Sequence, residues 1–121
     1  MIKFENVSKV YPNGTKGLTN INLTIEQGEF VAIIGTSGAG KSTLIRCVNG
    51  LNNITQGNLL VNDTDVAKLK GKELRQFRRH VGMIFQSYNL VPRATVLKNV
   101  MFARVPDMNL FKVIFGLFSK E

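Results

Sequence analysis

The pattern with the clearest chemistry in this 121-residue chain is a glycine-rich loop at residues 35–43. The loop reads Gly-Thr-Ser-Gly-Ala-Gly-Lys-Ser-Thr, which matches the G-x-x-x-x-G-K-[ST] pattern of phosphate-binding loops. Backbone N–H groups can surround an anionic phosphate only where no Cβ intervenes, and glycine also permits the backbone angles that this requires. The pattern therefore predicts a cradle for the phosphates of a nucleotide.

Three side chains at the end of this loop complete the predicted site. Lys41 is placed to reach the β- and γ-phosphates, and the Ser42 hydroxyl is placed to bind Mg²⁺. Thr43 adds a phosphate contact. A helix that begins here would turn its unpaired N–H groups and the positive end of its dipole toward the same phosphates. The predicted nucleotide-binding residues of the loop are Gly35, Thr36, Ser37, Gly38, Ala39, Gly40, Lys41, Ser42 and Thr43.

The elements around the loop must hold it in place. An apolar run at residues 30–34 predicts a buried strand over 29–34, directly before the loop, and residues 44–48 read as a helix directly after it. Alternating apolar and polar residues predict half-buried strands at 2–7 and 18–25. Another strand is expected at residues 58–61. These elements indicate one mixed α/β domain. The turns that separate them are expected at residues 11–14 and 27–28.

The second half of the chain supplies one further candidate residue. Residues 68–80 predict an amphipathic helix with a basic face, and a buried strand is expected at 81–85. That strand would place the amide of Gln86 at its end, before a loop bounded by proline, which fits either the edge of an active site or an ordinary solvated position. Residues 94–104 read as a further helix.

Composition narrows the classes of function. The formal net charge is +8, and no apolar run approaches the roughly 18 residues of a membrane span. The basic helix fits a solvated face, a contact with a partner or an anionic membrane surface, or a nucleic acid. It carries no array of aromatic residues for base stacking, so nucleic acid is not expected. Cys47 is expected to be a buried apolar residue, and His80 has no companions for a metal site. A cytosolic location follows.

The order of three features resembles the ATP-binding subunits of ABC transporters. These features are the aromatic Tyr11, the loop at 35–43 and the strand at 81–85 that ends at Gln86. The resemblance is greatest to the phosphonate-import group, and it is supported by residues 46–49, 71–75, 89–93 and 116–118. It implies a P-loop ATPase core with an N-terminal antiparallel β subdomain. Residues 1–121 would be the N-terminal part of that domain, truncated before the Walker B strand, because neither a Leu-Ser-Gly-Gly motif nor an apolar strand ending in Asp-Glu is found.

The resemblance also implies roles and partners. Tyr11 would stack on adenine, although an ordinary turn aromatic is the simpler alternative. Gln86 would sense the γ-phosphate through Mg²⁺ or the attacking water, which makes Lys41 and Gln86 the expected catalytic residues and Ser42 and Gln86 the expected metal ligands. The implied cofactors are ATP and Mg²⁺. The implied partners are permease subunits, a second ATP-binding subunit and a separate solute-binding protein, at the cytoplasmic face of the membrane.

Two other functions stay open at this point. One is a different P-loop enzyme, such as a kinase or a small GTPase, but no guanine-specific or acceptor-binding motif is found. The other is a basic interaction module whose loop is vestigial. For the chain alone we expect ATP binding with little turnover. We also expect marginal stability or self-association, because the sheet would be incomplete and the apolar tail at 110–118 would lack packing partners.

Overall fold

The computed structural model describes residues 1–86 and 89–102 of the chain. The chain divides into two compact units, Met1–Met83 and Ile84–Glu121.

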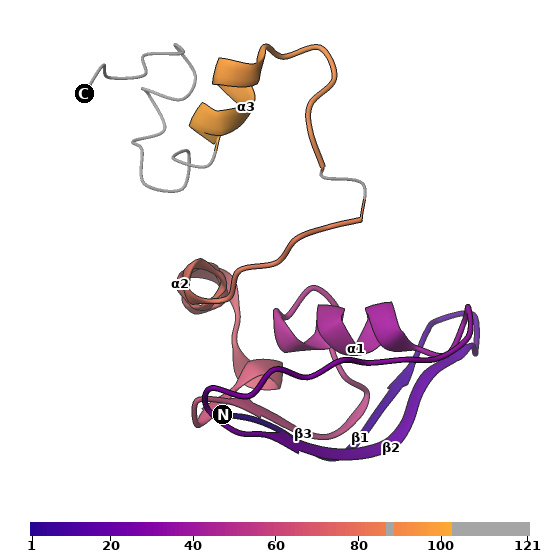
Figure 1. Ribbon diagram of the computed structural model, residues 1–121. Helices are drawn as coiled ribbons and strands as arrows, with labels where there is room; N and C mark the ends of the chain where they lie inside the picture. The colour runs from indigo at the N-terminus through magenta and orange to yellow at the C-terminus, as the bar shows by residue number, and fades with distance from the viewer. Residues whose placement is uncertain (87–88, 103–121) are drawn as a thin grey trace. The chain divides into compact units, whose positions relative to one another are not determined.

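A four-stranded antiparallel sheet forms the first unit (Figure 1). Its strand order is β2-β1-β3-β4. The strands are β1 (Ile2–Val10), β2 (Lys16–Ile25), β3 (Gln56–Val61) and β4 (Thr64–Asp65). The alternation of apolar residues in β1 and β2 explains why one face of the sheet is buried, since every second side chain points to the same face. The predicted antiparallel β subdomain is therefore confirmed.

The hairpin between β1 and β2 closes through the turn predicted at residues 11–14. The amide of Gly14 donates to the Tyr11 carbonyl at 2.9 Å, and the Tyr11 amide donates to the Thr15 carbonyl at 2.9 Å. Gly14 has a φ of 82°, which glycine adopts without steric cost. Both hydrogen bonds fix the backbone of Tyr11 at the end of β1.

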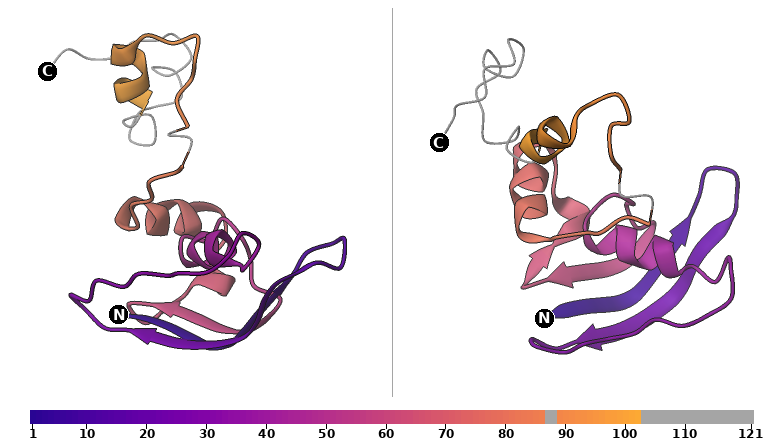
Figure 2. Two further views of the ribbon diagram at one scale, coloured as in Figure 1. Left: turned by 45° about the vertical axis from the view of Figure 1, so that its right-hand side comes forward. Right: turned by 45° about the horizontal axis from the view of Figure 1, so that its top comes forward.

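One helix covers one face of this sheet. The helix α1 (Lys41–Val48) follows the glycine-rich loop, as predicted, and lies over the sheet in each view (Figure 1, Figure 2). Cys47 on α1 is 0% exposed, which confirms its predicted burial. The core between the helix and the strands is small, and it consists of Phe4, Val7, Leu18, Cys47, Leu59, Val61 and Val66.

The predicted basic helix is also present. A short 3₁₀ turn, η1 (Val66–Lys68), leads into α2 (Gly71–His80). The Arg78 guanidinium donates to the carbonyls of Asn49 and Gly50, at 3.1 and 2.7 Å. Carbonyls at the end of a helix have no partner within that helix. Arg78 therefore attaches α2 to the end of α1, so at least one charge of the basic face is structural.

The second unit contains the helix α3 (Val96–Phe102), which lies within the helix expected at 94–104. The Asn99 side chain accepts from the Val91 amide at 2.8 Å and so ties this helix to the loop before it. The apolar tail at 110–118 lies outside the described residues. No helix in the described part of the chain is both long enough and apolar enough to cross a bilayer.

Two predicted strands are absent, and those predictions were wrong. Residues 29–34 form no strand, and the side chains of Phe30 and Ile34 are 97% and 93% exposed. Residues 81–85 form no strand either, and Ile84 is 91% exposed. A strand that is buried on both faces needs neighbouring strands and covering helices. Every strand pair among the described residues is antiparallel and belongs to the four-stranded sheet of β1 to β4. Residues 29–34 and 81–85 therefore lack neighbouring strands within the described part of the chain.

Candidate nucleotide-binding site

The glycine-rich loop leads directly into the first turn of α1. Gly38 and Gly40 have φ values of 83° and 87°, in the region that favours glycine. The amide of Ala39 donates to the Thr36 carbonyl at 3.2 Å, which closes a turn within the loop. Gly40 is the N-cap of α1 and has no side chain to satisfy the first amides of the helix. These amides are thus available to an anion.

The ammonium group of Lys41 lies across the loop. Its Nζ donates to the carbonyls of Gly35 and Thr36, each at 2.6 Å. An ammonium group has three N–H donors, and no further partner of Nζ occurs in the described part of the chain. Lys41 therefore places its positive charge within the glycine-rich loop and has one N–H donor left for a ligand.

The loop and α1 are attached to the sheet at the start of β2. A Cβ on Gly40 would overlap the carbonyl oxygen of Gly17. A Cβ on Gly17 would in turn come within 2.7 Å of the Tyr11 ring and 3.0 Å of the Thr43 methyl group. Position 40 therefore needs glycine because a backbone carbonyl lies so close, and position 17 needs it because the side chains of Tyr11 and Thr43 do. These contacts set where the first turn of α1 lies on the sheet.

Tyr11 joins three parts of the first unit. Its hydroxyl lies 3.0 Å from the hydroxyl of Thr43, and the side-chain amide of Asn52 donates to it at 3.2 Å. The Nζ of Lys9 lies 5.3 Å from the centroid of the Tyr11 ring, over one face. A base could stack only on the other face, or in place of Lys9. The predicted stacking on adenine stays a prediction.

Asn52 is the residue beside the candidate site that the sequence analysis did not predict. It lies in the loop after α1, and its backbone amide donates to the Arg46 carbonyl at 3.0 Å. It belongs to no motif, and an asparagine in a loop carries no signal of its own. Only the fold brings it to Tyr11.

The remaining predicted site residues divide between the two units. Ser42 is exposed in the first turn of α1, beside Lys41. Gln86 is exposed but belongs to the second unit, so its approach to the loop stays a prediction from the sequence. No group of three or more potential metal-binding side chains (His, Cys, Asp, Glu) occurs within residues 1–86 and 89–102. His80 bonds through Nδ1 to the Gln76 carbonyl oxygen at 3.0 Å, within α2.

Burial also shapes the chemistry of the single thiol. Burial raises the pKa of Cys47, and the nearby charge of Lys9 opposes this only in part. A raised pKa keeps the thiol protonated at neutral pH, and a protonated thiol is a poor nucleophile. Cys47 is therefore a core residue and takes no part in the chemistry of the loop.

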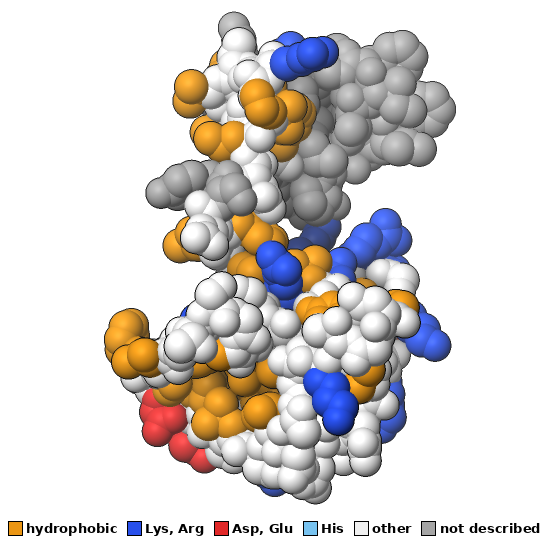
Figure 3. Space-filling model, turned by 90° about the vertical axis from the view of Figure 1, so that its right-hand side faces the viewer, with side chains coloured by type: hydrophobic (Ala, Val, Ile, Leu, Met, Phe, Trp, Pro, Cys, Tyr) orange, Lys and Arg blue, Asp and Glu red, His pale blue; other side chains and the backbone are white. Residues whose placement is uncertain are grey.

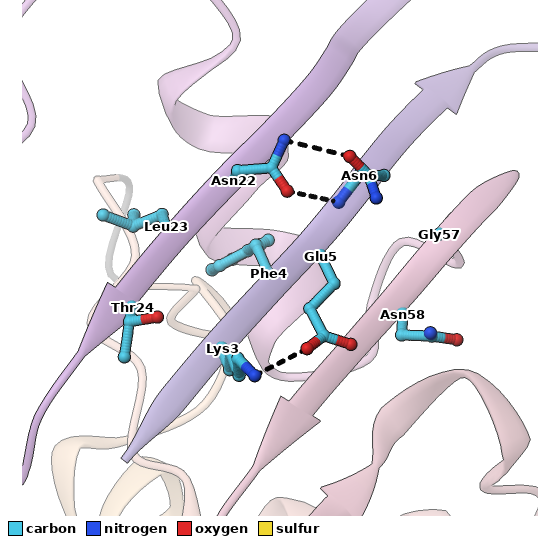
Figure 4. A pocket seen from close by; sticks show the side chains of 9 residues that line it. All are labelled: Lys3, Phe4, Glu5, Asn6, Asn22, Leu23, Thr24, Gly57 and Asn58. Atoms are coloured by element: carbon cyan, nitrogen blue, oxygen red, sulfur yellow. Dashed lines mark hydrogen bonds and ion pairs between the residues drawn. The ribbon is translucent and has the colours of Figure 1, made fainter.

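A hollow of about 600 Å³ lies on the sheet, away from the loop. Figure 4 shows its lining, in which Lys3 pairs with Glu5 and Asn6 pairs with Asn22. Asn6 has a φ of 50°, where β1 is irregular, and Asn22 satisfies its amide at 2.8 Å. None of the residues at 35–43 lines this hollow. The asparagine pair thus stabilises a strand irregularity, and the hollow is no part of the candidate site.

Exposed apolar and basic side chains share the surface. Figure 3 shows hydrophobic side chains on the first unit, with Lys and Arg side chains spread around them. Four of the large exposed apolar residues come from the segment before the loop: Phe30, Val31, Ile33 and Ile34.

Comparisons with known proteins show which family this chain resembles. The ABC transporter family matches residues 18–119 of the chain. The phosphonates import ATP-binding protein PhnC of Lactococcus lactis subsp. cremoris (strain SK11) is 88% identical over 121 residues, which are 100% of this chain and 49% of that protein. The protein of the same name from Bacillus thuringiensis subsp. konkukian (strain 97-27) is 59% identical over 100% of this chain and 47% of its own length.

Solved structures show the same fold. The ATP-binding cassette MJ0796, in a dimeric post-hydrolysis state bound to ADP and Pi, matches with a TM-score of 0.78 and 36% identity. The match covers 100% of this chain and 50% of that one. The chain thus spans about half the length of the curated relatives it matches. Since the family matches most of its residues, the chain belongs to the ABC transporter family.

Proposed function

We propose that the loop at 35–43 binds the triphosphate of ATP together with Mg²⁺. The observation that carries this proposal is the position of Lys41, whose ammonium group lies within the loop and bonds to two of its carbonyls at 2.6 Å. A phosphate oxygen is a stronger partner for an ammonium group than a neutral carbonyl. Bound nucleotide would therefore take up the free donor and replace at least one carbonyl.

The residues present fit a magnesium ion that arrives with the nucleotide. Mg²⁺ uses few protein ligands and takes most of its oxygens from phosphates and water. The exposed Ser42 hydroxyl in the first turn of α1 can supply one such ligand. Gln86 is the second candidate ligand. The ion, when bound, neutralises charge on the phosphates.

We infer that the chain is part of an ATP-binding subunit that powers import of a phosphonate or a similar anionic solute. The names of the relatives at 88% and 59% identity support this function. It implies permease subunits, a solute-binding protein and a second ATP-binding subunit at the cytoplasmic face of the membrane. The structure of a dimeric relative supports the last of these.

The residues of this sequence fit ATP binding but not ATP hydrolysis. Hydrolysis needs a residue that positions the attacking water, and this sequence has no apolar strand that ends in Asp-Glu. We therefore expect binding of Mg-ATP but little turnover by residues 1–121. Sustained hydrolysis by this chain would contradict that separation.

Calorimetric titration of the chain with Mg-ATP tests the proposal. Lys41→Ala removes a charge-assisted contact, so affinity should fall about 10- to 100-fold. Lys72→Ala is the matched control, because Lys72 is an exposed lysine on α2. Circular dichroism establishes that both variants keep the fold. Equal affinity of the Lys41→Ala variant and the unchanged chain would refute the proposal.

A further inference from the structure

Asn52, Tyr11 and Thr43 form a chain of hydrogen bonds beside the glycine-rich loop. The side-chain amide of Asn52 donates to the Tyr11 hydroxyl at 3.2 Å, and that hydroxyl lies 3.0 Å from the Thr43 hydroxyl. All three groups are partly buried. They come from the end of β1, the first turn of α1 and the loop after α1, so the fold alone brings them together.

Either hydroxyl could be the donor in the bond between Tyr11 and Thr43, and counting hydrogens favours one direction. A phenol carries one hydrogen, and an amide nitrogen can only donate. Because the Tyr11 oxygen accepts from Asn52, its own hydrogen is free to donate to the oxygen of Thr43. Thr43 then accepts this bond and keeps its own hydrogen. No other bond of the Thr43 hydroxyl occurs among the described residues.

We propose that Asn52 is a positioning residue of the nucleotide site: through the Tyr11 hydroxyl, it keeps the hydroxyl hydrogen of Thr43 available to a phosphate oxygen. The proposal rests on the proposed binding of nucleotide by the loop. It adds a residue from outside the loop, and it assigns the Tyr11 hydroxyl a role that is separate from any stacking of the ring. With the proposed bond from Thr43 to phosphate, three bonds run in one direction, and the hydrogens of both hydroxyl groups are used.

Asn52→Asp reverses the direction. A carboxylate only accepts, so Tyr11 would donate to it, and Thr43 would have to donate to Tyr11. The phosphate would then lose a donor. Affinity for Mg-ATP should fall about tenfold. Asn52→Ala should cost about threefold or less, because Tyr11 can still donate to Thr43.

Tyr11→Phe separates this effect from simple charge repulsion. Without the hydroxyl, nothing links position 52 to Thr43. The Asn52→Asp change should then lower affinity by no more than about twofold in the Tyr11→Phe background. A tenfold loss that persists in that background would mean that the new charge acts directly on the nucleotide, and it would overturn the proposal. Wild-type affinity of the Asn52→Asp variant would overturn it as well.

A measurement without nucleotide tests whether Asn52→Asp makes the Tyr11 hydroxyl donate to position 52. Tyr11 and Tyr88 are the only tyrosines and the chain has no tryptophan, so Tyr88→Phe leaves Tyr11 as the sole source of emission. A tyrosine that donates to a carboxylate loses fluorescence, because the excited phenol transfers its proton. Asn52→Asp should therefore quench Tyr11 in the Tyr88→Phe background. Unchanged emission would show that Tyr11 does not donate to the new carboxylate, so that Asn52→Asp does not reverse the bonds, and it would overturn the proposal.

Two further points keep the tests independent. If the Asn52→Asp variant does not fold, Thr43→Val serves in its place. Asn52→Ala should then cause no further loss of affinity for Mg-ATP when Thr43→Val is already present. A loss as large as that of Asn52→Ala in the unchanged chain would refute the proposal. The proposed function is tested by Lys41→Ala. If the proposed function fails that test, the fluorescence result still reports the direction of the bonds, because it needs no nucleotide.

Discussion

The strand β1 and the segment at residues 29–34 are both rich in residues that favour strands, yet only β1 forms one. Phe4 on β1 is 2% exposed, whereas Phe30 is 97% exposed. β1 pairs with β2 through a short turn and with β3 on its other side. The second segment has no such neighbour among the described residues. The difference teaches that an apolar run predicts a strand only where the chain also supplies its partners.

The glycine-rich loop follows the second of these regions in the chain and is attached to the sheet that contains the first. Its end and α1 are attached to the sheet through the close approach of Gly40 to Gly17 and through the bond of Tyr11 to Thr43. Its beginning follows the unpaired segment. We infer that the sheet alone can hold the residues that are predicted to contact phosphate. Each prediction below tests that contrast.

The largest expected effect is on stability. Phe4→Ala should lower the free energy of unfolding by about 3–5 kcal/mol, because it leaves a cavity in a small core. Phe30→Ala should change it by less than about 0.5 kcal/mol, because that side chain is already in water. Urea unfolding followed by circular dichroism measures both. A comparable loss from Phe30→Ala would show that residues 29–34 pack within this chain.

The next largest effect is the difference in stability between substitutions of the two loop glycines that have a positive φ, Gly38 and Gly40. Gly40→Ala and Gly38→Ala share the cost of a positive φ, but only the Cβ at position 40 meets the carbonyl oxygen of Gly17. Gly40→Ala should therefore cost about 1–3 kcal/mol more. Thermal unfolding of the matched pair measures this. Equal losses would mean that the loop is not attached to β2 through this contact.

The thiol of Cys47 reports whether α1 stays on the sheet. Because burial raises the pKa of Cys47 and also excludes reagent, a thiol reagent should label the native chain about tenfold or more slowly than the chain in urea. Labelling with and without urea at one pH gives the ratio. Equal rates would place α1 off the sheet in solution.

The smallest effect concerns the far edge of the sheet. A hydrogen bond from Lys68 lowers the pKa of Asp65, and the Ala67 amide contributes in the same direction, while partial burial opposes both. A lowered pKa means that the stabilisation is complete above the unfolded value of about 3.9 and is lost as the pH falls through the folded value. Asp65→Asn keeps a capping side chain but loses the ion pair with Lys68, so it should cost about 0.2–1 kcal/mol at pH 7.

The pH dependence of that cost is its control. At about pH 2 the carboxyl group is protonated in both states, so Asp65→Asn and the unchanged chain should unfold at nearly the same denaturant concentration. A difference that is constant with pH would mean that the charge of Asp65 does not contribute.

Local signals in the sequence predicted the parts that depend on local structure. The alternation in β1 and β2, the turn at Tyr11 and the helix after the loop were all visible, because periodicity and turn chemistry involve close neighbours in the chain. The loop at 35–43 was predicted residue by residue for the same reason. Its pattern needs only nine consecutive positions.

What depends on distant partners was not predicted. Residues 29–34 and 81–85 have the composition of buried strands, but composition does not say whether neighbouring strands are present. Asn52 reaches Tyr11 across 41 positions of sequence, and Arg78 reaches Asn49 across 29. No local pattern marks either contact. Such contacts follow from how the elements pack.

Residue-resolved amide hydrogen exchange, with and without Mg-ATP, tests the central claim most directly. We predict that amides of residues 44–48 are protected before nucleotide is added, that those of 37–43 become protected only with Mg-ATP, and that those of 30–34 exchange rapidly in both states. Lys41→Ala should abolish the change at 37–43. Protection of residues 30–34 without nucleotide, or no change at 37–43 with it, would contradict the account.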